Sequence, residues 1–489
     1  MVLVYSTKTI LIRKLNDGIC FMTIPRRHSA QEILVSALRT PLGNLVARPW
    51  FDRVALNTVA YWFFPLSRLW AAARAAEGSV DGFFESTGIV PSSRLTARLR
   101  RNLGEFETVR HRMVGIEKEW ETVFFGADAP SPDAALQAEH ERLTCRNLYN
   151  NLRRKFIPLR LANKVQPVRW HIPSPADVDA VYSALLADPA RAFAPPDPMP
   201  EITVSHRLAS SNGEQSYWLR FKSPSPRMND QVIARVFEPA NAENAPTLIF
   251  GHGICVEFDH WRGLVDEVEA MVQMGIRVVR PEAPWHGRRV PDGMYGGEKF
   301  IATAPMGALD LFTSAAQEWS VIMDWLRRTT NTPIAVGGSS LGAMTSQIIT
   351  DKSRHWPERL RPDAAFLVTH CGHIEDAVVH GKLAEVWGIA QATIDHGWRS
   401  DLIRRYMPLL EAEGRPVIPP QNIVTVLGDH DNVTPFNSAR TLIDEWQVPA
   451  ENRFIYRRGH FSVPLGMMRD HAPLVRLRQI LDRCPTGSG

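Results

Sequence analysis

The stretch Pro333-Ile334-Ala335-Val336-Gly337-Gly338-Ser339-Ser340-Leu341-Gly342 predicts the fold of this chain. Its first four residues have the character of a short buried strand, and a helical pattern, Ala343–Ile349, follows the last glycine. A serine within Gly-x-Ser-x-Gly, between a strand and a helix, is the arrangement that a nucleophile elbow requires. The flanking glycines remove side chains that would clash in so tight a turn. The motif therefore predicts a reactive serine at the end of a sheet strand.

The register of the motif selects Ser340. This serine has glycines at 338 and 342, whereas Ser339 would need glycines at 337 and 341, and position 341 is leucine. The start of the following helix lies directly behind Ser340, where its dipole favours a developing oxyanion. The alternative is a glycine-rich turn from strand to helix that carries no chemistry.

A serine nucleophile needs a histidine base and a carboxylate that orients it, in the chain order serine, acid, histidine. Asp431 follows a predicted strand in Gly428-Asp429-His430-Asp431-Asn432-Val433-Thr434-Pro435, and His460 follows the next strand in Arg458-Gly459-His460-Phe461. Open parallel sheets place their sites at these strand ends. Asp429 is the rival acid, but it directly follows Gly428 and is less able to reach the imidazole, so Asp431 is favoured.

An oxyanion hole needs two backbone N–H donors. We expect one from Leu341, the residue after the nucleophile. The second is expected from the loop Gly251-His252-Gly253-Ile254, which follows a predicted strand at 247–250. Ile254 is the first choice for this donor and Gly253 is the alternative.

The organisation of the chain changes near the proline-rich segment Ala192–Pro200. Residues 1–200 are predicted to be a largely helical N-terminal region of unknown role, and residues 201–489 a catalytic domain. In the second part, strands alternating with helices predict an α/β fold with a mainly parallel sheet covered on both faces. Strands are expected at 201–209, 216–221, 231–237, 247–250, 276–279, 332–336, 364–369, 423–427 and 453–457, and helices at 264–274 and 308–328.

A long connection separates the strands expected at 364–369 and 423–427. It has two helical patterns, Ile374–Ile389 and Thr393–Glu411. Because the connection exceeds an ordinary crossover, residues 373–420 are a candidate lid over the site.

These ordered motifs resemble the α/β-hydrolase family over roughly residues 200–480. The segment Pro284-Trp285-His286-Gly287-Arg288-Arg289 is similar to a Pro-x-x-Gly-Arg-Arg segment of a poorly characterised subgroup of that family, distantly like dienelactone-hydrolase relatives. The resemblance implies a serine hydrolase but no particular substrate. His252, Arg288 and Arg289 are candidate substrate-binding residues, the two arginines by bidentate contact with an anionic group. Salt bridges between loops are an equally good interpretation of the arginines.

The leading functional hypothesis is cleavage of a carboxylic ester or related acyl bond through an acyl-serine intermediate. An acyltransferase with the same triad and a non-catalytic α/β-hydrolase-like binding protein are the alternatives. A metal-dependent hydrolase is disfavoured, because His370-Cys371-Gly372-His373 does not form a known ligand spacing. The sequence predicts no metal and no cofactor, and the expected substrate is a small-molecule or lipid-like acyl compound.

Composition limits the remaining classes. The 489 residues include 56 Lys and Arg against 52 Asp and Glu, a net charge of +4, which indicates no nucleic-acid partner. The five scattered cysteines favour a reducing compartment and thus a cytoplasmic location. The apolar stretch Val54–Ala75 is interrupted by Asn57, Pro65 and Arg68 and makes a poor membrane span. Packing against the main domain is favoured over contact with a membrane surface, and the oligomeric state is not predicted.

Overall fold

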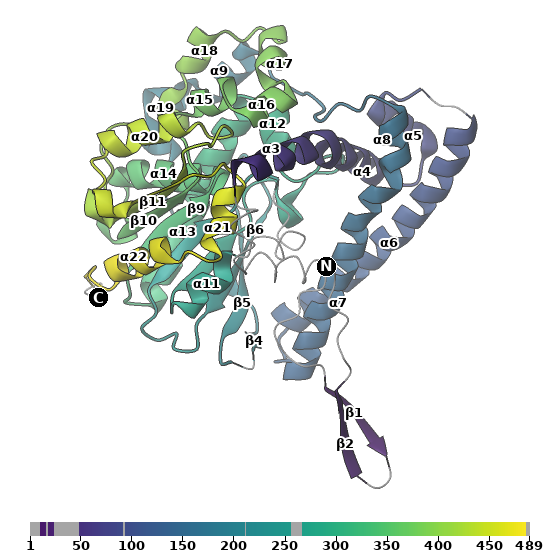
Figure 1. Ribbon diagram of the computed structural model, residues 1–489, viewed down its shortest axis with the longest axis horizontal. Helices are drawn as coiled ribbons and strands as arrows, with labels where there is room; N and C mark the ends of the chain where they lie inside the picture. Colours follow the sequence, from purple (N-terminus) through teal and green to yellow (C-terminus); the bar gives the residue numbers. More distant parts are fainter. Residues whose placement is uncertain are drawn as a thin grey trace.

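The sheet of the molecule has the strand order β12-β11-β10-β9-β7-β8-β6-β5-β3, with β4 paired to β5 (Figure 1). The computed structural model describes residues 10–15, 18–23, 48–90, 93–210, 212–255 and 267–485. Strands β7 to β12 run parallel, whereas β6 is antiparallel to both β5 and β8. Strand β7 lies between β9 and β8, so the chain crosses over after β7 and returns to pair β8 with β6. This is the strand order of the α/β-hydrolase fold. The strand bounds are β3 Thr203–Val204, β4 Leu208–Ala209, β5 Gln215–Lys222, β6 Gln231–Glu238, β7 Thr247–Gly251, β8 Arg277–Pro281, β9 Ile334–Ser339, β10 Ala364–Val368, β11 Ile423–Gly428 and β12 Arg453–Tyr456.

Helices cover both faces of the sheet, as the apolar strands predict. In β7, Ile249 joins one hydrophobic core, while Leu248 and Phe250 join the other, which follows the two-residue period of a strand. The first core includes residues of α13 (Met306–Thr329), α14 (Leu341–Lys352) and α20 (Phe436–Glu445). The second includes residues of α11 (Glu267–Gln273), α21 (Ser462–Met467) and α22 (Ala472–Leu481). A mainly parallel sheet with two covered faces is therefore confirmed.

The predicted strands and the helix at 308–328 are confirmed to within a few residues, except that 201–209 contains two two-residue strands, β3 and β4. Residues 264–266 of another predicted helix lie outside the described residues. The helical character predicted between β10 and β11 is confirmed, but the two helical patterns do not form two continuous helices. Five short helices lie there, and glycines with positive φ, Gly388 and Gly397, stand at two of the breaks: α15 Ile374–Val379, α16 Lys382–Trp387, α17 Ile389–Asp395, α18 Ser400–Arg404 and α19 Met407–Leu410.

The described part of the first 200 residues is largely helical, as predicted, and also contains an antiparallel hairpin, β1 (Ile10–Leu15) and β2 (Gly18–Thr23). The stretch 54–75 forms a nearly continuous helix, and residues 64–73 of it are buried. Within the described ranges, no helix is long and apolar enough to cross a bilayer. The helices are α3 Pro49–Thr58, η1 Val59–Phe63, α4 Phe64–Ala76, α5 Val80–Thr87, α6 Ser93–Phe125, α7 Pro132–Asn151, η2 Leu152–Phe156, α8 Ile157–Ala162, α9 Pro175–Ala187 and α10 Pro189–Ala192.

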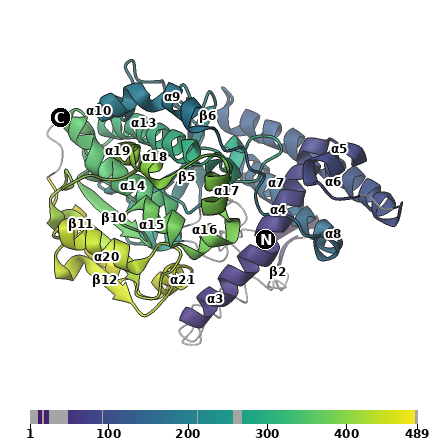
Figure 2. The same cartoon turned by 90° about the horizontal axis from the view of Figure 1, so that it is seen from above.

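The N-terminal helices share a hydrophobic core with the rest of the chain. Buried residues of α4, α5 and α6 cluster with Leu383 and Ala384 of α16 and with Val433, in the loop after β11. Helix α3 extends from this helical group to the edge of the sheet domain, where it lies near α21 (Figures 1 and 2). The remaining helical segments are the short turns η3 Gly287–Arg289, α12 Glu298–Ala302, η4 Ser353–His355, η5 Glu358–Leu360, η6 Pro420–Asn422 and η7 Ala450–Asn452.

Candidate active site

Ser340 stands in a strained turn between β9 and α14. Its φ of 54° and ψ of −116° lie outside the regions that an L-residue ordinarily adopts. Such a conformation costs about 1–3 kcal/mol and persists only where the surroundings impose it. Here the Ser340 N–H donates to the Val368 carbonyl of β10 at 2.9 Å. The turn thus holds the serine between a buried strand and the start of a helix.

The glycines on either side of Ser340 permit a very close approach of backbone segments. A Cβ on Gly338 would lie 2.3 Å from the carbonyl carbon of Gly342, and a Cβ on Gly342 would lie 2.2 Å from the carbonyl carbon of Gly251. Gly251 ends β7, so the loop after β7 lies directly beside the start of α14. Any side chain at Gly342 would push these two segments apart.

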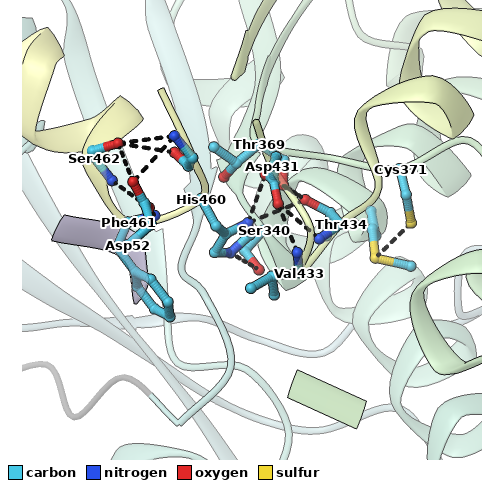
Figure 3. Close-up of polar contacts among 12 residues, drawn as sticks. Asp52, Ser340, Thr369, Cys371, Asp431, Val433, Thr434, His460, Phe461 and Ser462 are labelled. Carbon is cyan, nitrogen blue, oxygen red and sulfur yellow. Dashed lines mark hydrogen bonds and ion pairs between the residues drawn. The ribbon is translucent and has the colours of Figure 1, made fainter. Parts of the chain in front are cut away.

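Ser340, His460 and Asp431 form one hydrogen-bonded chain (Figure 3). The His460 Nε2 is 3.1 Å from the Ser340 Oγ, and its Nδ1 is 2.9 Å from the Asp431 Oδ2. His460 and Asp431 are buried, at 8% and 7% exposure. With the Nδ1 proton directed to the carboxylate, Nε2 is an acceptor for the serine hydroxyl.

The two candidate acids both lie in the loop after β11, but their side chains have different partners. Asp431 accepts the N–H groups of Val433 at 2.9 Å and Thr434 at 3.0 Å through Oδ1, which leaves Oδ2 facing His460. Asp429 instead contacts the half-exposed ring of its neighbour His430. The structure therefore brings Asp431, and not Asp429, to the imidazole of His460.

Thr434 is a site residue that the sequence did not reveal. Its Oγ1 lies 2.9 Å from the Asp431 Oδ2, 3.1 Å from the His460 Nδ1 and 3.0 Å from the Thr369 carbonyl oxygen. The single hydroxyl proton of Thr434 can go to the carboxylate or to the Thr369 carbonyl, and the hydroxyl oxygen lies beside the Nδ1 proton that His460 directs to Asp431. The position of Thr434 just after Asp431 was the available signal, since an aspartate side chain commonly accepts backbone N–H groups a few residues on and so brings those residues close to its carboxylate.

Two buried histidines support the loop after β7, which holds the predicted oxyanion donor Ile254. His252 Nε2 accepts the Ala283 N–H at 3.2 Å, so its Nδ1 donates to the Gly253 carbonyl at 2.8 Å. Burial, aided by the nearby ring of His286, holds the pKa of His252 well below its usual value, so the ring is neutral. His286 Nε2 accepts the Cys255 N–H at 3.1 Å. These contacts orient the loop beside α14, whose first residue is Leu341.

The candidate substrate-binding arginines have extensive contacts with other protein groups. Arg289 is 6% exposed, and its guanidinium contacts Glu318 at 2.6 Å and Asp230 at 2.8 Å. Arg288 lies 3.3 Å from Glu117 of α6 and stacks over the ring of Trp120. These ion pairs agree with the interpretation that both arginines form salt bridges within the protein. A role of His252, Arg288 or Arg289 in substrate binding stays a prediction.

Further histidines and cysteines lie outside this hydrogen-bonded chain. The buried His370 contacts the Thr425 hydroxyl at 2.8 Å, and His373 pairs with Glu411 at 2.9 Å. Burial lowers the pKa of His370 to about 4. In the described part of the chain, no three His, Cys, Asp or Glu side chains gather in a way that could hold a metal ion.

Comparison with known proteins finds likeness only among solved structures: no family model matches the chain, and no curated protein matches it. An S-formylglutathione hydrolase from Agrobacterium tumefaciens is 15% identical over 58% of this chain and 99% of its own, with a TM-score of 0.37. Acetyl xylan esterase 1 from Thermoanaerobacterium sp. JW/SL YS485 is 15% identical over 61% of this chain and 96% of its own, with a TM-score of 0.39. An acylaminoacyl peptidase from Pyrococcus horikoshii is 14% identical over 58% of this chain and 45% of its own, with a TM-score of 0.40.

Proposed function

We propose that this chain is a serine hydrolase that cleaves a carboxylic ester or a related acyl bond. In this proposal Ser340 is the nucleophile, His460 the general base and Asp431 the orienting acid. The observation that carries it is the unbroken path from the Ser340 Oγ through both ring nitrogens of His460 to the Asp431 carboxylate. A catalytically silent binding protein has no need for this path of hydrogen bonds or for a strained serine.

The first half of the reaction follows from these contacts. His460 Nε2 accepts the hydroxyl proton as the Ser340 Oγ attacks the acyl carbon. Asp431 stabilises the resulting imidazolium without taking its proton. The tetrahedral intermediate then breaks the bond to the leaving group, which receives the proton from His460, and an acyl-serine remains. In the second half, water gives its proton to His460, its oxygen attacks the acyl carbon, and the acid product leaves as Ser340 regains its hydroxyl proton.

The negative charge of the tetrahedral intermediate needs two donors. We assign these to the N–H groups of Leu341 and Ile254, with Gly253 as the alternative to Ile254. The close contact of Gly251 with Gly342 supports this assignment, because it brings the loop after β7 next to the residue that follows the nucleophile. Preorganised donors of this kind contribute about 2.7–4 kcal/mol each to transition-state stabilisation.

We assign catalysis to residues 201–489 and retain residues 373–420 as a candidate lid. Small acyl esters are the first choice of assay substrate, because their cleavage does not require the enzyme to recognise a particular leaving group. p-Nitrophenyl esters of increasing chain length would define the acyl preference. Products formed with alcohol or amine acceptors would separate hydrolysis from acyl transfer.

The test of the proposal compares Ser340→Ala with Ser339→Ala. Ser340→Ala should lower kcat by about 10⁴-fold or more and abolish labelling by a fluorophosphonate probe, while Ser339→Ala should retain both. The proposal fails if Ser340→Ala keeps full esterase activity and the probe does not label the wild-type protein.

A further inference from the structure

We propose that Asp52, on the N-terminal helix α3, is a positioning residue for His460, so that the N-terminal region supplies part of the active site. This inference rests on the proposed function. It also gives a role to a region that the motifs after residue 200 leave unexplained.

The Asp52 carboxylate binds the histidine loop from both sides of His460. Its Oδ2 accepts the Gly459 N–H at 3.1 Å, and its Oδ1 accepts the N–H groups of Phe461 at 2.6 Å and Ser462 at 3.1 Å. The Ser462 hydroxyl also donates to Oδ2. Figure 3 shows these contacts next to the chain from Ser340 to Asp431. The residue before His460 and the two residues after it are thus held by one side chain.

The alternative role for Asp52 is a local one in its own helix. An acidic residue in the first turn of a helix ordinarily satisfies the N–H groups of that turn or its dipole. The hydrogen bonds described above instead go to a segment more than four hundred residues away in the chain. Asp52 is also buried, at 9% exposure, which is a costly place for a carboxylate without such partners.

The fit between the two segments is close. A Cβ on Gly459 would lie 2.4 Å from the Asp52 Cγ, so only glycine at 459 admits the carboxylate. Within the histidine loop itself, the Ser462 hydroxyl accepts the Gly459 N–H at 2.9 Å while it donates to Asp52. The contact therefore constrains the backbone that sets the direction of the His460 ring.

Apolar packing supports the same connection. Phe461 packs against the hydrophobic core of the N-terminal helices, and Val433 is buried within that core. Val433 donates its N–H to Asp431, the orienting acid. The N-terminal region thus supports the loops that carry two of the three proposed triad residues.

The four acceptor contacts predict a graded response to substitution. Asp52→Ala removes all of them, so the N–H groups of Phe461 and Ser462 lose this acceptor while the Gly459 N–H keeps the Ser462 hydroxyl. Asp52→Asn can keep the Oδ1 contacts with Phe461 and Ser462, but its amide would direct N–H toward the Gly459 N–H. We expect kcat to fall about 100-fold for the alanine variant and about 10-fold for the asparagine variant, with KM unchanged within a factor of two.

The experiment measures kcat, KM, the rate of fluorophosphonate labelling and thermal unfolding for the full-length variants, all well below their Tm. Asp81→Ala, at an exposed position in the first turn of α5, is the matched control and should behave as wild type. Hydrogen exchange of a peptide that spans residues 459–462 gives a second readout that does not need activity, and it should speed up in Asp52→Ala.

Unchanged kcat in Asp52→Ala overturns the inference, and so does unchanged exchange at 459–462. A fall in kcat that only follows loss of folded protein in the unfolding curves would also overturn it. Failure of the proposed function looks different, because the wild-type protein would then resist the fluorophosphonate. In that case faster exchange in Asp52→Ala would still support the hold on the loop, and unchanged exchange would refute it.

Discussion

Arg289 offers a sharp test of whether the second arginine of the Gly-Arg-Arg segment supports the fold or binds substrate. Its guanidinium is 6% exposed and pairs with Glu318, which is 2% exposed, and with Asp230. In Arg289→Met the Glu318 carboxylate would stay buried without its cationic partner, and would keep only the hydrogen bond from the Ser223 hydroxyl. Breaking a buried pair from one side costs about 3–5 kcal/mol.

That free energy converts to a shift in Tm. The N-terminal helices share a core with the sheet domain, so the whole chain of 489 residues is taken as one cooperative unit. With an unfolding entropy of about 2.1 cal/mol/K per residue, the expected fall is roughly 3–5 °C. Thermal unfolding followed by circular dichroism would measure it. Arg399→Met is the control, because Arg399 pairs with Asp401 on the surface and its loss should leave Tm unchanged.

A double variant separates the charge effect from lost packing. Arg289→Met with Glu318→Met removes both charges, so it should recover part of the Tm lost in Arg289→Met. In steady-state assays below the Tm, KM should stay at the wild-type value. A normal Tm together with a raised KM would refute the structural role and favour substrate binding by Arg289.

Three further predictions, two of them with a control variant, concern other features of the site and its surroundings. Asp431→Asn should lower kcat by about 10⁴-fold because the wrong histidine tautomer forms, whereas Asp429→Asn should retain activity. Burial opposes ionisation of Glu117, but three neighbouring guanidinium groups outweigh it and lower its pKa to about 2 from 4.5. Its stabilising contribution is therefore complete above pH 4.5 and lost as the pH falls toward 2, so Glu117→Gln should lower Tm at neutral pH and flatten its acid dependence. Gly342→Ala should destabilise the fold by about 3 kcal/mol or more in denaturant unfolding, because its Cβ would overlap Gly251. Gly115→Ala, where a Cβ meets open space in α6, should be neutral or stabilising by about 0.5–1 kcal/mol.

Short-range patterns predicted most of the sheet. Each of the strands around Ser340 is a buried apolar run next to a turn, and the elbow needs only five consecutive residues to specify its conformation. Helical periodicity also located α13, because one long amphipathic pattern covers it. It did not locate the breaks between the helices that lie between β10 and β11, where Gly388 and Gly397 adopt positive φ after α16 and α17.

The local sequence thus contained the elbow at Ser340 and the order in which acid and histidine follow it, because strand, turn and helix preferences act over a few residues. The partners of each polar side chain depend on segments distant in the chain. Folding brings Asp52 to the loop of His460, Thr434 to the imidazole and Glu318 to Arg289. No spacing in the sequence encodes those distances, since burial and hydrogen bonding select among carboxylates and hydroxyls only once the layers have packed.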